Sequence, residues 1–225
     1  ISQHKMLKSL ELKKEDYIKL KKIARQNKID FLVSVFDEKS LDFFEKHIKS
    51  KIIKIPSGEI TNYFLLKKIN LKKYKVILST GMSNLTEIKD ALNVISKKEV
   101  FEIKNNNIFI KNKKKYLYIK DRIFLLHCVS DYPTKEKYLN LNCIKTLKDQ
   151  FKLVIGFSDH TKGIEASKIS LAVGAKIIEK HFTLNKKMKG PDHKASLNIS
   201  ELNQLVKKIR NTELILGKDN KKTTK

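Results

Sequence analysis

Two kinds of hydrophobic pattern alternate along the 225-residue chain. Short runs that are apolar nearly throughout are separated by longer segments whose apolar residues recur at helical spacing. The short runs span residues 31–35, 52–57, 75–80, 122–128, 152–158 and 175–182. The helical segments include residues 12–26, 41–48, 62–69, 85–95, 141–151, 164–173 and 200–216. This alternation predicts a parallel sheet covered by helices.

Each of the six predicted strands ends in polar or small residues, as in Ser57-Gly58-Glu59 after the second run. A doubly wound sheet concentrates its site at one switch point, whereas a (β/α)8 barrel gathers chemistry from many strand ends. The pattern therefore predicts an α/β fold of the (β/α)8 TIM-barrel type. Because a helix over residues 12–26 opens the chain, we interpret the six runs as strands 3–8 of an incomplete barrel whose first two strands are absent.

One segment, residues 97–121, interrupts this alternation. Its apolar residues alternate with polar ones on either side of an Asn-rich turn. This predicts an inserted β-hairpin near residues 99–120, with a disordered Lys/Asn loop as the alternative. We expect one N-terminally truncated barrel domain over residues 1–216, with residues 217–225 as the start of a linker.

Composition is ordinary for a globular protein, at 40% hydrophobic residues, but the formal net charge is +25. Lysines spread over most segments supply it, since arginine is confined to Arg25, Arg122 and Arg210. Base and phosphate recognition favours the planar fork of arginine, so we expect no nucleic-acid partner. An attraction for anionic metabolites is compatible with the charge.

No apolar run approaches the roughly 20 residues that a membrane span needs, and residues 1–14 lack the apolar core of a signal peptide. We therefore expect a cytoplasmic protein with no membrane partner. Cys128 and Cys143 lack the spacing of a zinc site and are interpreted as small buried thiols.

His160 and His181 end two consecutive predicted strands. Neighbouring parallel strands lie about 4.8 Å apart, so two such imidazoles can bind one divalent cation and leave positions for substrate and water. A purely structural role is the alternative for each histidine. Glu179 shares the strand parity of His181, so we expect it to point into the barrel and pair with a lysine or support the metal ligands.

A second cluster of strand-end residues has the composition of an anion site. It comprises Ser57, Ser79, Ser158, Gly58, Gly81 and Lys54. Hydroxyls, backbone N–H groups and an ammonium can together hold a phosphate or carboxylate, although serine and glycine also end strands simply because turns favour them. Lys54 or Lys180 could instead form a Schiff base. The loop over residues 188–196, with Asp192 and His193, is either a grip for a polyol or an exposed turn.

Taken in order, seven motifs closely resemble the N-acetylneuraminate (sialic acid) synthase family, which includes legionaminic and pseudaminic acid synthases and spore-coat polysaccharide relatives. They are KIPSGEITN (54–62), VILSTGMSNLTEI (76–88), LLHCVSDYPT (125–134), LNLNCIKTL (139–147), GFSDHTKGIEAS (156–167), GAKIIEKHFTL (174–184) and GPDHKASL (190–197). The resemblance runs from about residue 2 to residue 217. It implies a TIM-barrel transferase that condenses phosphoenolpyruvate with an open-chain N-acetylhexosamine, such as N-acetylmannosamine, to give a sialic-type nonulosonic acid and phosphate. It also implies a divalent metal, Mn²⁺ or Mg²⁺.

Carried over position by position, the resemblance makes His160 and His181 the metal ligands and, together with Lys54, the catalytic residues. The positions matching phosphoenolpyruvate contacts are Lys54, Ser57, Ser79 and Ser158, and Ser34 lies near another, although Val35 replaces the usual proline. The positions matching sugar contacts are Glu59, Tyr132 and Asp192.

Two parts of the family pattern are not found in the sequence. One is an initial strand with a Glu-containing motif, and the other is a C-terminal antifreeze-protein-like domain that in relatives crosses to the partner subunit. The resemblance implies that the full-length form is a homodimer. We expect these 225 residues alone to turn over poorly. An inactive remnant, or a fragment that binds a complete synthase, is the alternative function.

Overall fold

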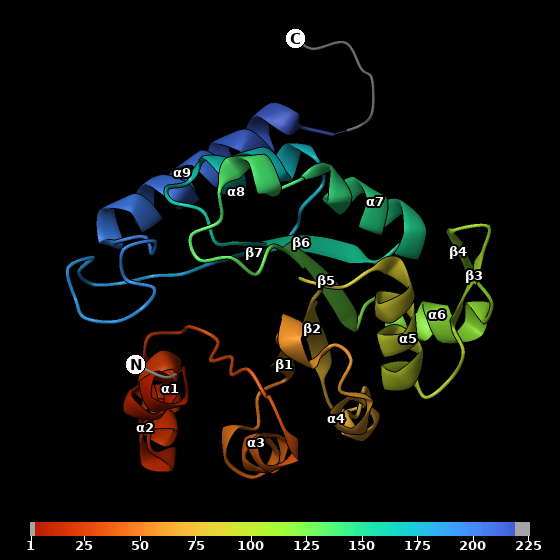
Figure 1. Ribbon diagram of the computed structural model, residues 1–225, viewed down its shortest axis with the longest axis horizontal. Coiled ribbons are helices and arrows are strands. Elements are labelled where there is room, and N and C mark those ends of the chain that lie inside the picture. The colour runs from red at the N-terminus through yellow and green to blue at the C-terminus, as the bar shows by residue number, and fades with distance from the viewer. Residues whose placement is uncertain (1–2, 219–225) are drawn as a thin grey trace.

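The computed structural model describes residues 3–218, and its centre is a parallel sheet with the strand order β1-β2-β5-β6-β7 (Figure 1). The strands are β1 (Ile52–Ile55), β2 (Lys75–Ser79), β5 (Ile123–Cys128), β6 (Val154–Asp159) and β7 (Ile178–Lys180). Each neighbouring pair is parallel. The prediction of a parallel α/β sheet is therefore confirmed.

The described part of the sheet curls into half of a barrel, with β1 and β7 as its last full strands (Figure 1). Beyond β1, Ser34 forms an isolated parallel bridge with Lys54, and beyond β7, Phe182 forms one with Leu197. The predicted strand over residues 31–35 is thus wrong in extent. Only Ser34 pairs, because at the edge of the sheet this segment has a neighbouring strand on one side alone. That the six runs are strands 3–8 of a barrel lacking its first two strands stays a prediction.

Helices cover the convex face of the sheet and leave the concave face open toward α1 and α2 (Figure 1). Their bounds are α1 (Gln3–Leu10), α2 (Lys14–Gln26), α3 (Glu38–Phe43) with a π-helical turn (Phe44–Ile48), α4 (Tyr63–Lys68), α5 (Leu85–Ser96), α7 (Asn142–Phe151), α8 (Glu165–Ala172) and α9 (Ile199–Leu216). Reciprocal side-chain caps start several of them; for example, Asn84 with Glu87 begins α5, and Asn198 with Glu201 begins α9. The predicted helical segments are confirmed. Of the predicted linker, residues 219–225 lie outside the described residues.

The predicted insertion is a hairpin followed by a helix. Strands β3 (Phe101–Lys104) and β4 (Asn107–Ile110) are antiparallel, and the turn residues Asn105 and Asn106 have φ of 47° and 60°. Two successive positive φ angles are typical of a type I′ hairpin turn. The prediction of a hairpin as far as residue 120 is wrong, because α6 (Lys113–Ile119) follows, started by the Asn112 side chain accepting from Lys115 N at 2.9 Å.

The two faces of the sheet differ in burial. On the convex face, side chains such as Ile53, Leu78, Ile123 and Phe157 are fully buried against the helices. The concave face carries polar groups at the carboxyl ends of its strands. Apolar residues nearer the amino ends, such as Phe124, are only partly buried. The core therefore lies between sheet and helices, and the concave face is left for chemistry.

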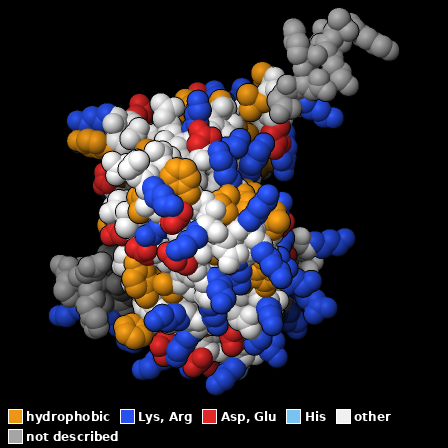
Figure 2. All heavy atoms as spheres, turned by 90° about the vertical axis from the view of Figure 1, so that its right-hand side faces the viewer, with side chains coloured by type: hydrophobic (Ala, Val, Ile, Leu, Met, Phe, Trp, Pro, Cys, Tyr) orange, Lys and Arg blue, Asp and Glu red, His pale blue; other side chains and the backbone are white. Residues whose placement is uncertain are grey.

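Figure 2 shows lysines scattered over one face of the molecule, among acidic and apolar side chains. This distribution matches the sequence, where lysine occurs in nearly every surface segment. No helix within residues 3–218 is long and apolar enough to cross a membrane.

Candidate active site at the strand ends

Polar side chains meet on the concave face, where β1, β6 and β7 end. The strand register places Ser158 of β6 beside both Cys128 of β5 and Glu179 of β7. Because side chains alternate between the faces of a strand, His160 and His181 follow Ser158 and Glu179 onto the same face. The short strands thus bring residues as far apart in the sequence as Lys54 and Glu179 to one edge of the sheet.

Lys54 crosses the concave face from β1 to β7. Its Nζ lies 2.8 and 2.7 Å from the two carboxylate oxygens of Glu179, and Ser158 Oγ donates to Glu179 Oε1 at 2.6 Å. Burial acts to raise the pKa of Glu179, but the Lys54 ammonium and the Ser158 hydroxyl together hold this pKa below its ordinary value. Both carboxylate oxygens of Glu179 contact the Lys54 Nζ, which disfavours the Schiff-base alternative at this residue because that reaction needs an unengaged amine.

His160 is held in one tautomer by its neighbours. Its Nδ1 lies 2.7 Å from the carbonyl oxygen of Val129, so Nδ1 carries the proton and donates it. Burial lowers the pKa of His160, which keeps the ring neutral at pH 7. Ser158 Oγ lies 3.2 Å from Nε2, but its single proton goes to Glu179. The Nε2 lone pair therefore remains available to an electrophile.

The His181 ring lies beside that of His160, with centroids 5.4 Å apart and planes at 79°. Tyr132 packs against both rings, at centroid distances of 4.1 Å from His160 and 5.5 Å from His181. Asp192 Oδ2 lies 3.5 Å from His181 Nδ1. Burial raises the pKa of Tyr132, so its hydroxyl stays protonated. The structure thus brings together two predicted metal ligands and two predicted sugar contacts.

The spacing of the two imidazole rings is compatible with both binding one divalent cation. With metal–nitrogen bonds of about 2.1 Å, two rings sharing one ion have centroids at most roughly 6.5 Å apart, and the observed separation of 5.4 Å lies within this limit. The neutral state and lone pair of His160 also suit coordination. Within residues 3–218, no group of three or more His, Cys, Asp or Glu side chains is placed to hold a metal. Any ion bound here would therefore take its remaining ligands from water, from substrate or from groups other than the His, Cys, Asp and Glu side chains of residues 3–218.

A small cluster of donors surrounds Ser57, at the carboxyl end of β1. Ser57 Oγ accepts from Gly81 N at 3.0 Å and lies 3.1 Å from Cys128 Sγ. A Cβ added to Gly81 would stand 2.7 Å from Ser130 Oγ and 2.9 Å from both Cys128 Sγ and Ser57 Oγ, so only glycine fits without displacement. The sequence did not indicate Cys128, although its strand parity with Ser158 is a signal that could have placed it here.

Three further predicted residues lie around this cluster. Ser34 pairs with Lys54 through the edge bridge, and Ser79 is buried at the end of β2. Glu59 accepts from Asn62 Nδ2 at 2.8 Å, a contact within its own turn. The structure therefore places Ser34 and Ser79 near Lys54 and Ser57, whereas Glu59 sits in the turn that follows β1.

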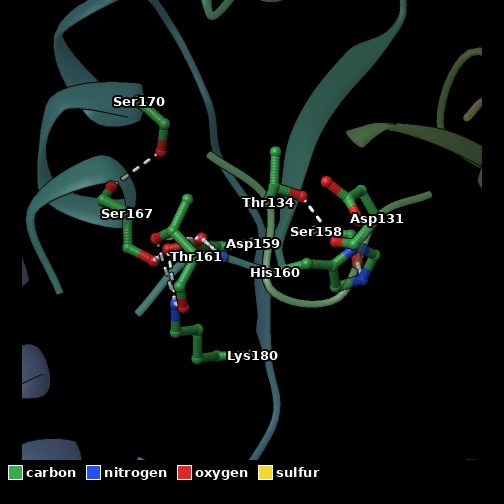
Figure 3. Close-up of polar contacts among 9 residues, drawn as sticks. All are labelled: Asp131, Thr134, Ser158, Asp159, His160, Thr161, Ser167, Ser170 and Lys180. Atoms are coloured by element: carbon green, nitrogen blue, oxygen red, sulfur yellow. Dashed lines mark hydrogen bonds and ion pairs between the residues drawn. The ribbon is translucent and has the colours of Figure 1, made fainter. Parts of the chain in front are cut away.

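Asp159 and Lys180 point away from the concave face, and Figure 3 shows Asp159 on the opposite side of its strand from Ser158 and His160. Lys180 Nζ lies 2.9 Å from Asp159 Oδ2, and the two side chains are 5% and 0% exposed. Burial lowers the pKa of Lys180, while the Asp159 carboxylate opposes that effect. Lys180 is therefore remote from the mouth of the sheet, which rules against it as the Schiff-base lysine. Its parity, opposite to that of His181, is the sequence signal for this placement.

The concave face thus carries an ammonium, an ionised carboxylate, hydroxyls and two imidazoles at the carboxyl ends of parallel strands. This is where α/β proteins of the TIM-barrel type place their active sites, and the curled parallel half-barrel makes the protein an α/β protein consistent with a partial fold of that type. More narrowly, the chain belongs to the NeuB family, whose model matches residues 1–221. The family resemblance expected from the seven motifs is confirmed.

Named relatives and a solved structure agree with this membership. The chain is 45% identical over its whole length to the N,N'-diacetyllegionaminic acid synthase of Campylobacter jejuni, covering 61% of that protein. It is 40% identical to the N,N'-diacetyllegionaminic acid synthase of Legionella pneumophila, with 98% of this chain and 57% of that protein covered. It therefore spans about three fifths of these relatives. The N-acetylneuraminic acid (sialic acid) synthetase of Leptospira borgpetersenii, solved in complex with citrate, matches with a TM-score of 0.83 at 33% identity, covering 98% of this chain and 70% of that one.

Proposed function

We propose that this chain carries the metal and phosphoenolpyruvate half of a nonulosonic acid synthase, which condenses phosphoenolpyruvate with an N-acetylated amino sugar. The observation that carries the proposal is the placement of His160 and His181, with rings 5.4 Å apart, directly above the Lys54–Glu179–Ser158 cluster. An aldehyde activated at the histidines would then lie beside an anion held by the lysine and hydroxyls.

The anion seat is built from groups that favour negative charge. Lys54 supplies an ammonium, Ser57 supplies a hydroxyl, and Gly81 supplies a backbone N–H that already points at Ser57 Oγ. The Ser158 hydroxyl, which donates to Glu179 in this structure, would turn toward the bound anion. Charge-assisted hydrogen bonds of this kind are shorter and stronger than neutral ones. We infer that they hold the phosphate and carboxylate of phosphoenolpyruvate, with Glu179 limiting how far Lys54 can move.

The sugar would approach from the open mouth, over the two histidines. Tyr132 is half exposed there and presents both an aromatic face and a protonated hydroxyl, while Asp192 offers a carboxylate beside His181. A divalent ion held by His160 and His181 would supply Lewis acidity to the sugar aldehyde oxygen. The names of the Campylobacter and Legionella relatives favour a diacetamido sugar as the acceptor.

The reaction then balances without an external acid, base or oxidant. A bond forms between C3 of phosphoenolpyruvate and the aldehyde carbon of the sugar, and the electron-poor C2 that results takes up water. The C2–O bond to phosphate breaks, phosphate leaves, and the oxygen from water remains as the 2-keto oxygen. Water loses both of its protons: one is gained by the former aldehyde oxygen and the other leaves on the phosphate as HPO₄²⁻. The residues of this chain therefore need only bind, orient and stabilise charge.

A phosphate-release assay tests the proposal in the intact protein with Mn²⁺ and phosphoenolpyruvate. N-acetylmannosamine, its 6-phosphate and the diacetamido sugar of legionaminate synthesis are compared as acceptors. We expect release with at least one acceptor, and a fall to background in His181→Ala. The matched control is His47→Ala, because His47 lies in the π-helical turn and packs against the Phe43 ring, outside the site. Unchanged release in His181→Ala would remove the metal assignment, and no release with any of the three sugars would remove the proposed reaction.

A further inference from the structure

A buried ion pair lies on the convex side of the sheet, directly behind the two histidines. Asp159 is the last residue of β6 and Lys180 is the last residue of β7, and they are cross-strand partners in the register. Their side chains are 0% and 5% exposed, and they face the helix layer rather than the mouth. The site described above uses neither side chain.

Asp159 is saturated with donors (Figure 3). Its Oδ1 accepts from Thr161 N at 2.8 Å and from Thr161 Oγ1 at 2.7 Å, and its Oδ2 accepts from Ser167 Oγ at 2.5 Å besides the Lys180 ammonium at 2.9 Å. Lys180 Nζ also donates to the Thr161 carbonyl oxygen at 2.6 Å. The network therefore ties together the end of β6, the turn that follows it, helix α8 and the end of β7.

Each member of the pair immediately precedes one of the histidines. Asp159 is followed by His160 and Lys180 by His181, and because successive side chains alternate between faces, the pair points outward while the imidazoles point inward. Strand β7 is only three residues long, and its ladder with β6 ends at the Asp159–Lys180 partners. The last lateral tie before the imidazoles is thus this ion pair.

Stability alone does not account for such a pair. Replacing a buried ion pair by well-packed apolar residues is often neutral or stabilising, because two charges must be desolvated. An apolar pair cannot fix the separation of the two side chains or the direction in which they point. A carboxylate that accepts from four donors fixes both. The network fixes Asp159 and Lys180, and these residues are adjacent in the chain to His160 and His181, whose spacing matters most for a shared ligand.

We propose that Asp159 and Lys180 are positioning residues, which set the spacing and orientation of the His160 and His181 imidazoles so that both can hold one divalent cation. This inference rests on the proposed function, in which those histidines bind the ion. Groups that orient metal ligands typically change metal affinity ten- to hundredfold when they are replaced. We expect a loss in that range here.

The test is the double variant Asp159→Asn with Lys180→Met in the intact protein, which removes both charges at similar volume. Its matched control is Glu99→Gln with Lys111→Met, an exposed pair in the inserted hairpin. Isothermal titration with Mn²⁺ alone measures affinity, and thermal unfolding measures stability. Nuclear Overhauser contacts between the ring protons of His160 and His181 report the spacing in metal-free protein.

For the double variant we expect a Mn²⁺ dissociation constant raised roughly ten- to hundredfold and weaker ring-to-ring contacts, with a melting temperature close to that of the control. Unchanged Mn²⁺ affinity and unchanged ring contacts would overturn the positioning role. If wild-type protein binds no Mn²⁺, the proposed function fails, and the ring contacts alone then decide the inference. Should the double variant not fold, Ser167→Ala replaces it, since it removes one donor to Asp159 and is expected to weaken Mn²⁺ binding severalfold.

Discussion

Replacing Gly81 by alanine tests whether the space beside Ser57 is the seat of an anion. The backbone of Gly81 does not have a positive φ, so alanine is compatible with its conformation. The new methyl group would meet Ser130 Oγ, Cys128 Sγ and Ser57 Oγ at 2.7–2.9 Å, and each must retreat by at least about half an ångström. Ser57 Oγ would then leave the hydrogen bond from Gly81 N.

The expected magnitudes follow from those contacts. Overpacking of this kind costs about 1–3 kcal/mol of unfolding free energy. A hydroxyl displaced from a charged ligand loses about 1.5–3 kcal/mol, and since 1.4 kcal/mol is a factor of ten, the KM for phosphoenolpyruvate should rise roughly ten- to hundredfold. The KM for the sugar should change little, because Tyr132 and Asp192 lie beside the histidines rather than beside Gly81.

The assay is phosphate release with phosphoenolpyruvate varied at saturating sugar, alongside urea denaturation. Gly58→Ala is the control, since a Cβ at Gly58 meets nothing within 4 Å. Ser57→Ala, which removes the hydroxyl without adding an atom, covers the case in which Gly81→Ala does not fold. A folded Gly81→Ala variant with the KM of the wild type would refute the anion seat.

Two further predictions concern ionisable groups. In Lys54→Met, no ammonium opposes the effect of burial on Glu179, so the pKa of Glu179 should rise above its ordinary value in a carboxyl NMR titration. The value of kcat/KM should fall roughly a hundredfold. A Glu179 pKa that stays below its ordinary value would contradict the pairing with Lys54. Burial lowers the pKa of His127 below 6.5, so the unfolded chain binds more protons than the folded one, and the unfolding free energy should fall as pH drops from about 7 to 5. Urea denaturation at both pH values should show a smaller fall in unfolding free energy for His127→Gln than for the wild type. An equal fall in the two proteins would contradict the role assigned to His127.

Most of the fold was predictable because its strands are short runs that are apolar nearly throughout and its helices are amphipathic. The prediction failed where a tertiary neighbour decides the outcome. Residues 31–35 have the composition of a strand, yet only Ser34 pairs, because pairing depends on neighbours that composition does not reveal. In the insertion, the cap at Asn112 starts a helix where the alternating pattern suggested a continued strand.

Residues of the candidate site were predictable where they end strands, because parallel strand ends share one edge of a sheet. Strand parity also placed Glu179 on the inner face, where it pairs with Lys54 as expected. What spacing could not give was the identity of each contact, such as the Val129 carbonyl that fixes the His160 tautomer. Such contacts depend on loop paths after the strands, and loop paths have no periodic signature.

The register of β7 is a case where charge specifies what hydrophobicity leaves open. A shift of one residue against β6 would turn Lys180 toward the mouth and His181 toward the helices, because side chains alternate with a period of two. The apolar pattern opposes this weakly, since Ile178 is the one apolar residue of the strand and is itself only half-buried. The Asp159–Lys180 pair, however, forms only in the observed register, and a shifted register would leave the Asp159 carboxylate buried without its cation. The direction in which His181 faces is therefore specified by an ion pair on the side of the sheet opposite the imidazoles.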